Sequence, residues 1–190
     1  MTRVIALPDA FLARPIAHRG LHDRGAGRVE NAPASFAAAI EAQYGIELDL
    51  QLSADNVAMV FHDAQLDRLT AETGPVAGRT ADALTQIALT DSSDTIPTLA
   101  QVLAQVAGQV PLLIELKDQD GAFGPDIGAL EQATADALRG YDGPVAVMSF
   151  NPHSVTAMAQ LLPDVPRGLT TCAFQGDEAE NLPPARLSHL

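Results

Sequence analysis

The chain contains very little cysteine, and this scarcity limits how it can be cross-linked or bind a metal. Cys172 is the only cysteine among 190 residues. A single cysteine cannot form an internal disulfide, and it excludes a zinc site that needs several thiolates. We therefore interpret Cys172 as a small buried apolar residue. The length predicts a single domain over residues 1–190, stabilised by its own apolar core.

Long apolar runs are also missing, although 47% of the residues are hydrophobic and 18% are charged. No stretch reaches the ~20 apolar residues that a membrane-spanning helix needs. We therefore expect a soluble, globular protein without stable membrane insertion. The segment Met1–Arg14 lacks the basic start, continuous apolar stretch and small-residue cleavage site of an export signal. A cytoplasmic location is the corresponding expectation.

Positive charge is scarce, with 11 Lys and Arg residues against 24 Asp and Glu, which gives a net charge of −13. Lys117 is the only lysine. A protein of this charge repels nucleic acid and anionic membrane surfaces. A small-molecule substrate is expected instead of nucleic acid, and the sequence carries no indication of the oligomeric state.

Short β-type runs alternate with helical segments, which is the pattern of a parallel sheet whose crossovers are helices. Helix starts are indicated by Pro33, by Thr98 with Gln101 as a capping box, and by Asn151-Pro152; Gly45 indicates the end of the first of these helices. The predicted strands are Pro15–His18, Gly45–Leu50, Val57–Phe61, Val110–Leu116, Pro144–Phe150 and Val165–Thr171.

The predicted fold class is α/β, as an incomplete parallel β/α barrel. Six strand–helix units can be counted, whereas a closed barrel of this type has eight. The chain is either a fragment without the last two units, an open doubly wound sheet, or a sheet closed by a partner. We favour the fragment, because Leu182–Leu190 shows no sign of a final strand or helix. Residues 63–97, with a helical patch at Thr80–Ala88, are predicted to be a small insertion after the third strand, and Glu178–Ala185 to be a loop or a frayed end.

Ionisable residues gather where the predicted strands end. In chain order they are His18, Glu47, Asp49, His62, Glu115 and Lys117. Alternate residues of a strand face the same way, and active sites of α/β proteins lie at the carboxyl ends of the strands. Charges in a buried parallel strand are costly unless they are paired, hydrogen-bonded or bound to a metal. We therefore predict that these side chains converge at one mouth of the sheet.

The three carboxylates of this set, Glu47, Asp49 and Glu115, are the candidate metal ligands. Carboxylate oxygens suit a hard divalent cation, Mg²⁺ or Ca²⁺, better than zinc. For a single carboxylate, a salt bridge to Arg19 or Lys117 would be the simpler interpretation. Three carboxylates at matching depth favour one divalent cation.

His18 and His62 are the candidate acid and base. An unperturbed histidine titrates near pH ~6.5, so a pair beside a phosphate can exchange protons with it at neutral pH. A lone histidine at a strand end is more often a packed residue, but here two adjoin the carboxylate strands. We interpret His22, His153 and His189 as surface or loop residues.

Arg19 and Lys117 are the candidate phosphate ligands. A guanidinium can hold phosphate oxygens bidentately, and an ammonium adds a point charge beside a metal. Pairing with the carboxylates is the alternative, and we expect both roles in the substrate-free protein. Gly20 permits either a close backbone approach to a ligand or a simple turn.

Together these motifs resemble the glycerophosphodiester phosphodiesterase family, within the phospholipase C-like phosphodiesterase superfamily. Each motif alone is weakly specific, whereas the ordered set over nearly the whole chain is specific. The matching pieces are His18-Arg19-Gly20, Glu30-Asn31, Ile46-Glu47-Leu48-Asp49, Phe61-His62-Asp63, Leu66-Asp67-Arg68, Ile96-Pro97-Thr98-Leu99, Ile114-Glu115-Leu116-Lys117 and Ser149-Phe150.

The resemblance implies a TIM barrel with a small insertion after its third strand, and it implies roles for the quoted residues. Glu47, Asp49 and Glu115 fall at metal ligands, His18 and His62 at the acid/base pair, and Arg19 and Lys117 at phosphate-binding cations. Further positions support or line the site; they are Glu30, Asn31, Asp63, Ser149 and Phe150.

The implied reaction cleaves a glycerophosphodiester to glycerol 3-phosphate and an alcohol. By analogy, the neighbouring glycerol hydroxyl attacks phosphorus, one histidine deprotonates it and the other protonates the leaving alkoxide. The chain departs from the family pattern at Ala32 and Leu69, where threonine is usual, and it has no tryptophan. The apparent loss of the last two units is the larger departure.

Two other functions remain open. A metal-dependent lyase of the sphingomyelinase D or phospholipase C kind, which forms a cyclic phosphate from a phospholipid headgroup, could use the same two histidines and the same cation. A catalytically impaired, truncated domain could bind metal or phosphate only. Every expected ionisable position is filled, which favours the hydrolase.

Overall fold

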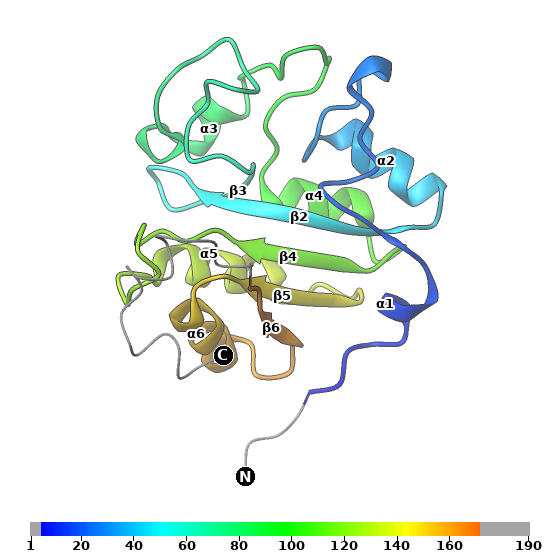
Figure 1. Ribbon diagram of the computed structural model, residues 1–190, viewed down its shortest axis with the longest axis vertical. Helices are drawn as coiled ribbons and strands as arrows, with labels where there is room; N and C mark the ends of the chain where they lie inside the picture. The colour runs from blue at the N-terminus through cyan, green and yellow to red at the C-terminus, as the bar shows by residue number, and fades with distance from the viewer. Residues whose placement is uncertain (1–4, 172–190) are drawn as a thin grey trace, which may run out of the picture.

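The computed structural model describes residues 5–171 and contains a sheet and the helices that pack on it (Figure 1). The strands are β1 (Ile16–Ala17), β2 (Gly45–Leu52), β3 (Ala58–Val60), β4 (Leu112–Leu116), β5 (Val145–Ser149) and β6 (Arg167–Leu169). The helices are α1 (Ala10–Ala13), α2 (Pro33–Glu41), α3 (Ala81–Leu84), α4 (Leu99–Val106), α5 (Ala129–Leu138) and α6 (Pro152–Leu161). Two 3₁₀ turns are η1 (Arg24–Ala26) and η2 (Val76–Gly78). The predictions for Cys172, His189, Glu178–Ala185 and Leu182–Leu190 lie outside the described residues.

The parallel strands follow one another in chain order across the sheet, as β1-β2-β4-β5-β6. The register places Ile16 beside Gly45 and Asp49 beside Glu115. A doubly wound sheet would reverse its strand order at a switch point, and the order here has no reversal. The winding is therefore that of a β/α barrel.

Within residues 5–171, helices α2, α4, α5 and α6 pack on one face of this sheet. Ile46 and Leu48 of β2 and Ile114 of β4 are fully buried in one apolar cluster with side chains from α2, α4, α5 and α6. In Figure 1, α4 and α5 lie behind the strands. Side chains at alternate positions project from the opposite face, which is the inner face of a barrel. The fold is thus an incomplete TIM-type barrel, with five parallel strands over residues 5–171, whereas a closed barrel has eight.

Strand β3 departs from the predicted pattern, because it pairs antiparallel with β2, with Leu50 opposite Val60. A parallel pair needs a crossover of about a dozen residues. Only residues 53–57 separate the two strands, and Asn56 takes the left-handed conformation (φ 60°) that turns the chain back. The prediction of six parallel strand–helix units was therefore wrong, since Val57–Phe61 forms a hairpin.

Residues 61–98 form a region with its own apolar core. Leu66, Leu84 and Ile96 are fully buried in a second cluster that also includes Met59 and Phe61. The region lies above the β2–β3 hairpin in Figure 1. Its helix is shorter than the predicted Thr80–Ala88 patch, since α3 ends at Leu84. The interpretation of residues 63–97 as an insertion stays a prediction.

The predicted helix starts are present in the structure. Pro33 is the first residue of α2. Thr98 accepts from the Gln101 amide (3.2 Å) and its own amide donates to Gln101 Oε1 (2.8 Å), so the capping box before α4 is confirmed. The prediction that Gly45 ends the first helix was wrong, because α2 ends at Glu41, Gln43 takes the left-handed conformation (φ 56°) and Gly45 begins β2. Among the described residues, no helix is long and apolar enough to cross a membrane.

Candidate active site

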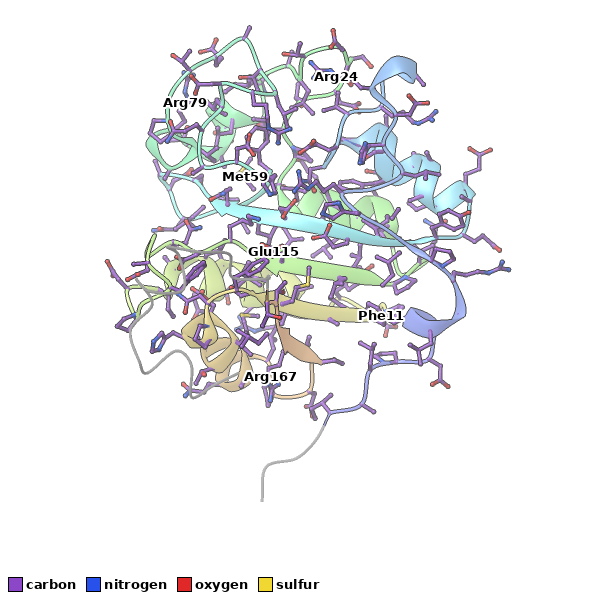
Figure 2. The ribbon with its side chains drawn as sticks, in the orientation of Figure 1. Phe11, Arg24, Met59, Arg79, Glu115 and Arg167 are labelled. Carbon is purple, nitrogen blue, oxygen red and sulfur yellow. The ribbon has the colours of Figure 1, made fainter. Side chains whose placement is uncertain are left out.

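Three carboxylates lie together on the inner face of the sheet. Glu47 and Asp49 are two residues apart on β2, and Glu115 is the register partner of Asp49 on β4. One oxygen from each of the three lies within 4.8 Å of the others. Figure 2 labels Glu115 where β4 runs beside β2. Pairing between β2 and β4 thus joins residues that are far apart in the chain.

The surroundings of these carboxylates fit a divalent cation. All three residues are buried, yet Glu47 Oε1 has no hydrogen-bond partner. Burial, together with the charge of Asp49, raises the pKa of Glu47 to about 7, although the Arg19 amide lowers it. Lys117 Nζ neutralises part of the charge, at 2.8 Å from Glu115 Oε1 and 3.3 Å from Asp49 Oδ1. Because the available donors are hard oxygens with one left unpaired, the cluster can hold a divalent metal ion.

Asn31 fixes the orientation of Asp49. The side-chain Nδ2 of Asn31 donates to Asp49 Oδ2 (2.8 Å), and the side-chain Oδ1 of Asn31 accepts from the Asp49 backbone N–H (3.2 Å). Asn31 is buried in the left-handed conformation (φ 56°), which asparagine adopts more readily than most residues. The first bond holds the carboxylate at Oδ2 and the second holds the Asp49 backbone, so that Asp49 Oδ1 is left facing Lys117.

Arg19 contacts this cluster through its backbone and its side chain. Its backbone N–H donates to Glu47 Oε2 (3.0 Å), its Nη1 donates to Glu30 Oε1 (2.8 Å), and its Nε lies 3.4 Å from Asp49 Oδ2. Arg19 takes the left-handed conformation (φ 58°), which is uncommon for a residue with a side chain. Gly20 is a packed turn residue, since a Cβ there would lie 2.4 Å from Ser35 Oγ. In the described protein Arg19 and Lys117 therefore both pair with carboxylates.

The two histidines reach the site from different strands. His18 follows β1, and its Nε2 lies 3.8 Å from Glu47 Oε2 with 70% of the side chain exposed. His62 follows the antiparallel β3, which runs back along β2, so that the Phe61 amide donates to the Asp49 carbonyl (3.0 Å). Gln51 then holds the His62 carbonyl (2.9 Å). The hairpin thus places His62 on the site although β3 is not a parallel strand.

The ring of His62 is oriented by Asp63, whose Oδ1 lies 2.6 Å from His62 Nδ1. Arg68 bonds both oxygens of Asp63 (Nε to Oδ2 2.6 Å, Nη2 to Oδ1 3.0 Å). Hydrogen bonds from Arg68 are the main reason why the pKa of Asp63 and that of Glu30 are each lowered to about 2. Both carboxylates are therefore ionised at neutral pH.

A cavity of about 770 Å³ opens beside Glu115 and Lys117. It is lined by Gln51, His62, Asp63, Ala64, Gln65, Glu115, Lys117, Asp118, Phe123 and Phe150. His18 and Arg19 do not line it and contact the carboxylates from the side of β1. Ser149 is buried away from it, with its hydroxyl donating to the Leu116 carbonyl (2.7 Å), so it joins β4 to β5.

Some residues of the site were not selected from the sequence. Gln51 continues the alternation of Glu47 and Asp49 on β2, and that spacing could have identified it. Arg68 belongs to a quoted motif, but no role was assigned to it. Phe123 lies between β4 and α5, outside any regular element, and no sequence pattern indicated that it lines the cavity.

These features define the class of protein: a β/α-barrel protein with a buried carboxylate centre, bordered by two histidines and two cations. Residues 18–183 match the glycerophosphoryl diester phosphodiesterase family. The chain belongs to this family.

Individual relatives agree with this assignment. A glycerophosphodiester phosphodiesterase of Caldanaerobacter subterraneus is 31% identical over 164 residues, which is 81% of this chain and 65% of the relative. A glycerophosphodiester phosphodiesterase of Bacillus subtilis is 30% identical over 182 residues, and the match covers 59% of that relative. An Oleispira antarctica phosphodiesterase, solved with its product sn-glycerol-3-phosphate, superposes with a TM-score of 0.74 at 27% identity, over 93% of this chain and 71% of that one. The chain thus spans about 60 to 65% of the length of these two curated relatives.

Proposed function

We propose that the protein is a metal-dependent phosphodiester hydrolase that cleaves glycerophosphodiesters to glycerol 3-phosphate and an alcohol. The observation that carries this proposal is the convergence of Glu47, Asp49 and Glu115 within 4.8 Å, with His18 beside Glu47 and His62 lining the same cavity as Glu115. Family membership and the glycerol 3-phosphate bound to the Oleispira phosphodiesterase support the choice of substrate. The substrate is a small molecule, and we place the reaction in glycerol and lipid metabolism in the cytoplasm.

One divalent cation, Mg²⁺ or Ca²⁺, would be held by the same three carboxylates. When bound, it supplies a positive charge that neutralises the phosphodiester oxygens and favours ionisation of a nearby hydroxyl. Glu47 Oε1, which is buried without a partner, is the oxygen best placed to gain from such an ion. Lys117, which bridges Glu115 and Asp49, would supply a second positive charge beside the phosphate.

The protein's own groups divide the remaining work of the reaction. Arg19 and Lys117 orient the phosphodiester and balance the charge that develops on its oxygens. Because ionised Asp63 only accepts hydrogen bonds, His62 carries its proton on Nδ1 and presents a basic Nε2. His18, exposed beside Glu47, is free to exchange a proton with water or substrate. One histidine takes the proton of the attacking glycerol hydroxyl and the other protonates the leaving alkoxide, which gives the free alcohol and a cyclic glycerol phosphate. Water then attacks phosphorus with the two histidines in exchanged roles, and the ring opens to glycerol 3-phosphate.

The proposal is tested by a panel of glycerophosphodiesters with different headgroup alcohols, incubated with and without a chelator. Glycerol 3-phosphate and free alcohol as products that require added Mg²⁺ or Ca²⁺ would support the hydrolase. A cyclic phosphate as the sole end product would show a lyase instead. Cation binding without turnover of any panel member would refute the hydrolase and would show that the protein is a metal-binding domain.

A further inference from the structure

Arg68 connects His62 to Arg19 through two carboxylates, those of Asp63 and Glu30. On one side its guanidinium donates to Asp63 Oδ2 (2.6 Å) and Oδ1 (3.0 Å). On the other it donates to Glu30 Oε1 (2.7 Å) and Oε2 (3.0 Å). Few side chains can do this, because only a guanidinium offers five donors in a planar fork.

Each of these carboxylates in turn holds a group of the site. Asp63 accepts from His62 Nδ1 at 2.6 Å, and Glu30 accepts from Arg19 Nη1 at 2.8 Å. His62 follows β3, whereas Arg19 follows β1, so these groups come from separate parts of the chain. The described contacts form one continuous path from His62 through Arg68 to Arg19.

The region of residues 61–98 places Arg68 at this point. Leu66 and Leu69, on either side of Arg68 in the chain, are buried in the second apolar cluster. The Leu66 amide donates to the Gly74 carbonyl (2.9 Å) and the Leu66 carbonyl accepts from the Thr70 amide (3.1 Å). The backbone on both sides of Arg68 is therefore anchored, and the guanidinium is directed to the site.

We propose that Arg68 is a positioning residue for phosphodiester cleavage, which holds His62 in its Nδ1–H tautomer through Asp63 and holds the Arg19 guanidinium through Glu30. The proposal rests on the proposed function, since it assumes that His62 and Arg19 act on a phosphodiester. Arg68 is not one of the three clustered carboxylates or of the residues that line the cavity, and it reaches the cavity only through Asp63. Loss of Arg68 would free Asp63 to rotate and would leave Glu30 to pull Arg19 away from the substrate.

The experiment compares Arg68→Gln and Arg68→Lys with Arg79→Gln in the 190-residue chain. Arg79 is a matched control, because it belongs to the same region and pairs with Glu72 (2.9 Å), away from Glu115 in Figure 2. We expect Arg68→Gln to lower kcat/KM by about 10- to 100-fold. The misplaced His62 should lower kcat, and the misplaced Arg19 should raise KM. Arg68→Lys should not restore activity, because an ammonium cannot bond both carboxylates bidentately. Arg79→Gln should stay within about twofold of wild type.

Nitrogen NMR of the His62 ring provides a second measurement that does not need turnover. Wild type should show the Nδ1–H tautomer, and both Arg68 variants should show a mixture of tautomers while Arg79→Gln does not. A single Nδ1–H tautomer in the Arg68 variants, or wild-type kcat/KM in Arg68→Gln, would overturn the proposal. If wild type cleaves no phosphodiester, the proposed function fails, and the tautomer comparison alone then decides the role of Arg68. Should Arg68→Gln not fold, Arg68→Lys carries both measurements.

Discussion

At the scale of single residues, the site depends on charges that are buried and only partly balanced. Glu47, Asp49 and Glu115 are at most 7% exposed, and Lys117 and Arg19 supply the cations beside them. Burying such charges is unfavourable unless each finds a partner. The surplus of negative charge is the physical reason to expect a bound cation.

Glu47→Gln tests the carboxylate cluster. Glutamine keeps the shape of the side chain and can still accept from the Arg19 amide, but it removes one charged metal ligand. We expect affinity for Mg²⁺ or Ca²⁺ to fall by about 100-fold or more, measured by calorimetric titration, and turnover to be lost while circular dichroism shows a retained fold. Glu41→Gln, at an exposed position of α2, is the control. Wild-type hydrolysis by Glu47→Gln would show that its assigned role is wrong.

His18→Ala separates catalysis from metal binding. The side chain is 70% exposed and lies 3.8 Å from Glu47, so its removal should leave the carboxylates in place. We expect turnover to fall by about 10²- to 10⁴-fold, while cation affinity stays within about threefold of wild type. His153→Ala, an exposed position of α6, should change neither quantity. An active His18→Ala enzyme would remove His18 from the mechanism.

Arg68 should make a contribution to stability that disappears in acid. The pKa values of Glu30 and Asp63 fall from ordinary values of 4.5 and 3.8 to about 2 in the folded protein, chiefly through Arg68. The unfolded chain binds more protons between these values, so the stabilisation is complete above pH ~5 and is lost as pH falls toward ~2.

Urea unfolding of wild type and Arg68→Gln at several pH values measures this contribution. We expect a difference of about 1–2 kcal/mol at pH 7, a modest value because the Arg68 side chain is 46% exposed. The difference should shrink steadily below pH ~4.5. A difference that stays constant or grows down to pH 3 would contradict the pKa directions.

At the scale of elements, the helix starts were predictable from short local patterns, whereas strand direction was not. Thr98 with Gln101 and Asn151-Pro152 encode their caps within a few residues. The direction of β3 depends on the length of residues 53–57 and on the left-handed Asn56, which a count of β-type runs does not consider. The backbone of residues 61–98 is joined by isolated pairings such as Thr70 with Leu89, which follow no periodic pattern.

Substitutions at Asn56 test the hairpin that brings His62 to the site. Asn56 has φ 60°, which glycine adopts freely and a β-branched residue adopts at a cost of about 1–2 kcal/mol. We expect Asn56→Val to lower the free energy of unfolding by about that amount, and Asn56→Gly to change it by less than about 0.5 kcal/mol. Urea denaturation measures both. Equal stability of the two variants would contradict the left-handed turn.

At the scale of the whole molecule, the order of the parallel strands explains why sequence reasoning could reach the site. Glu47, Asp49 and Glu115 lie side by side because β2 and β4 are neighbours, and both strands end at the same edge of the sheet. Alternation along each strand then fixes the face on which they project. Phe123, which lines the cavity, and Arg68, which connects His62 to Arg19, belong to irregular segments. Their roles therefore could be recognised only from the three-dimensional structure.

The most direct test of the central claim follows one sample by phosphorus NMR as its metal is removed and restored. The protein is incubated with sn-glycero-3-phosphocholine and the other glycerophosphodiesters of the panel, first with Mg²⁺ or Ca²⁺, then with excess chelator, then with the cation again. The account predicts a growing glycerol 3-phosphate signal that stops on chelation and resumes when the cation returns. Hydrolysis that continues unchanged in the chelator, or no hydrolysis of any panel member with either cation, would contradict it.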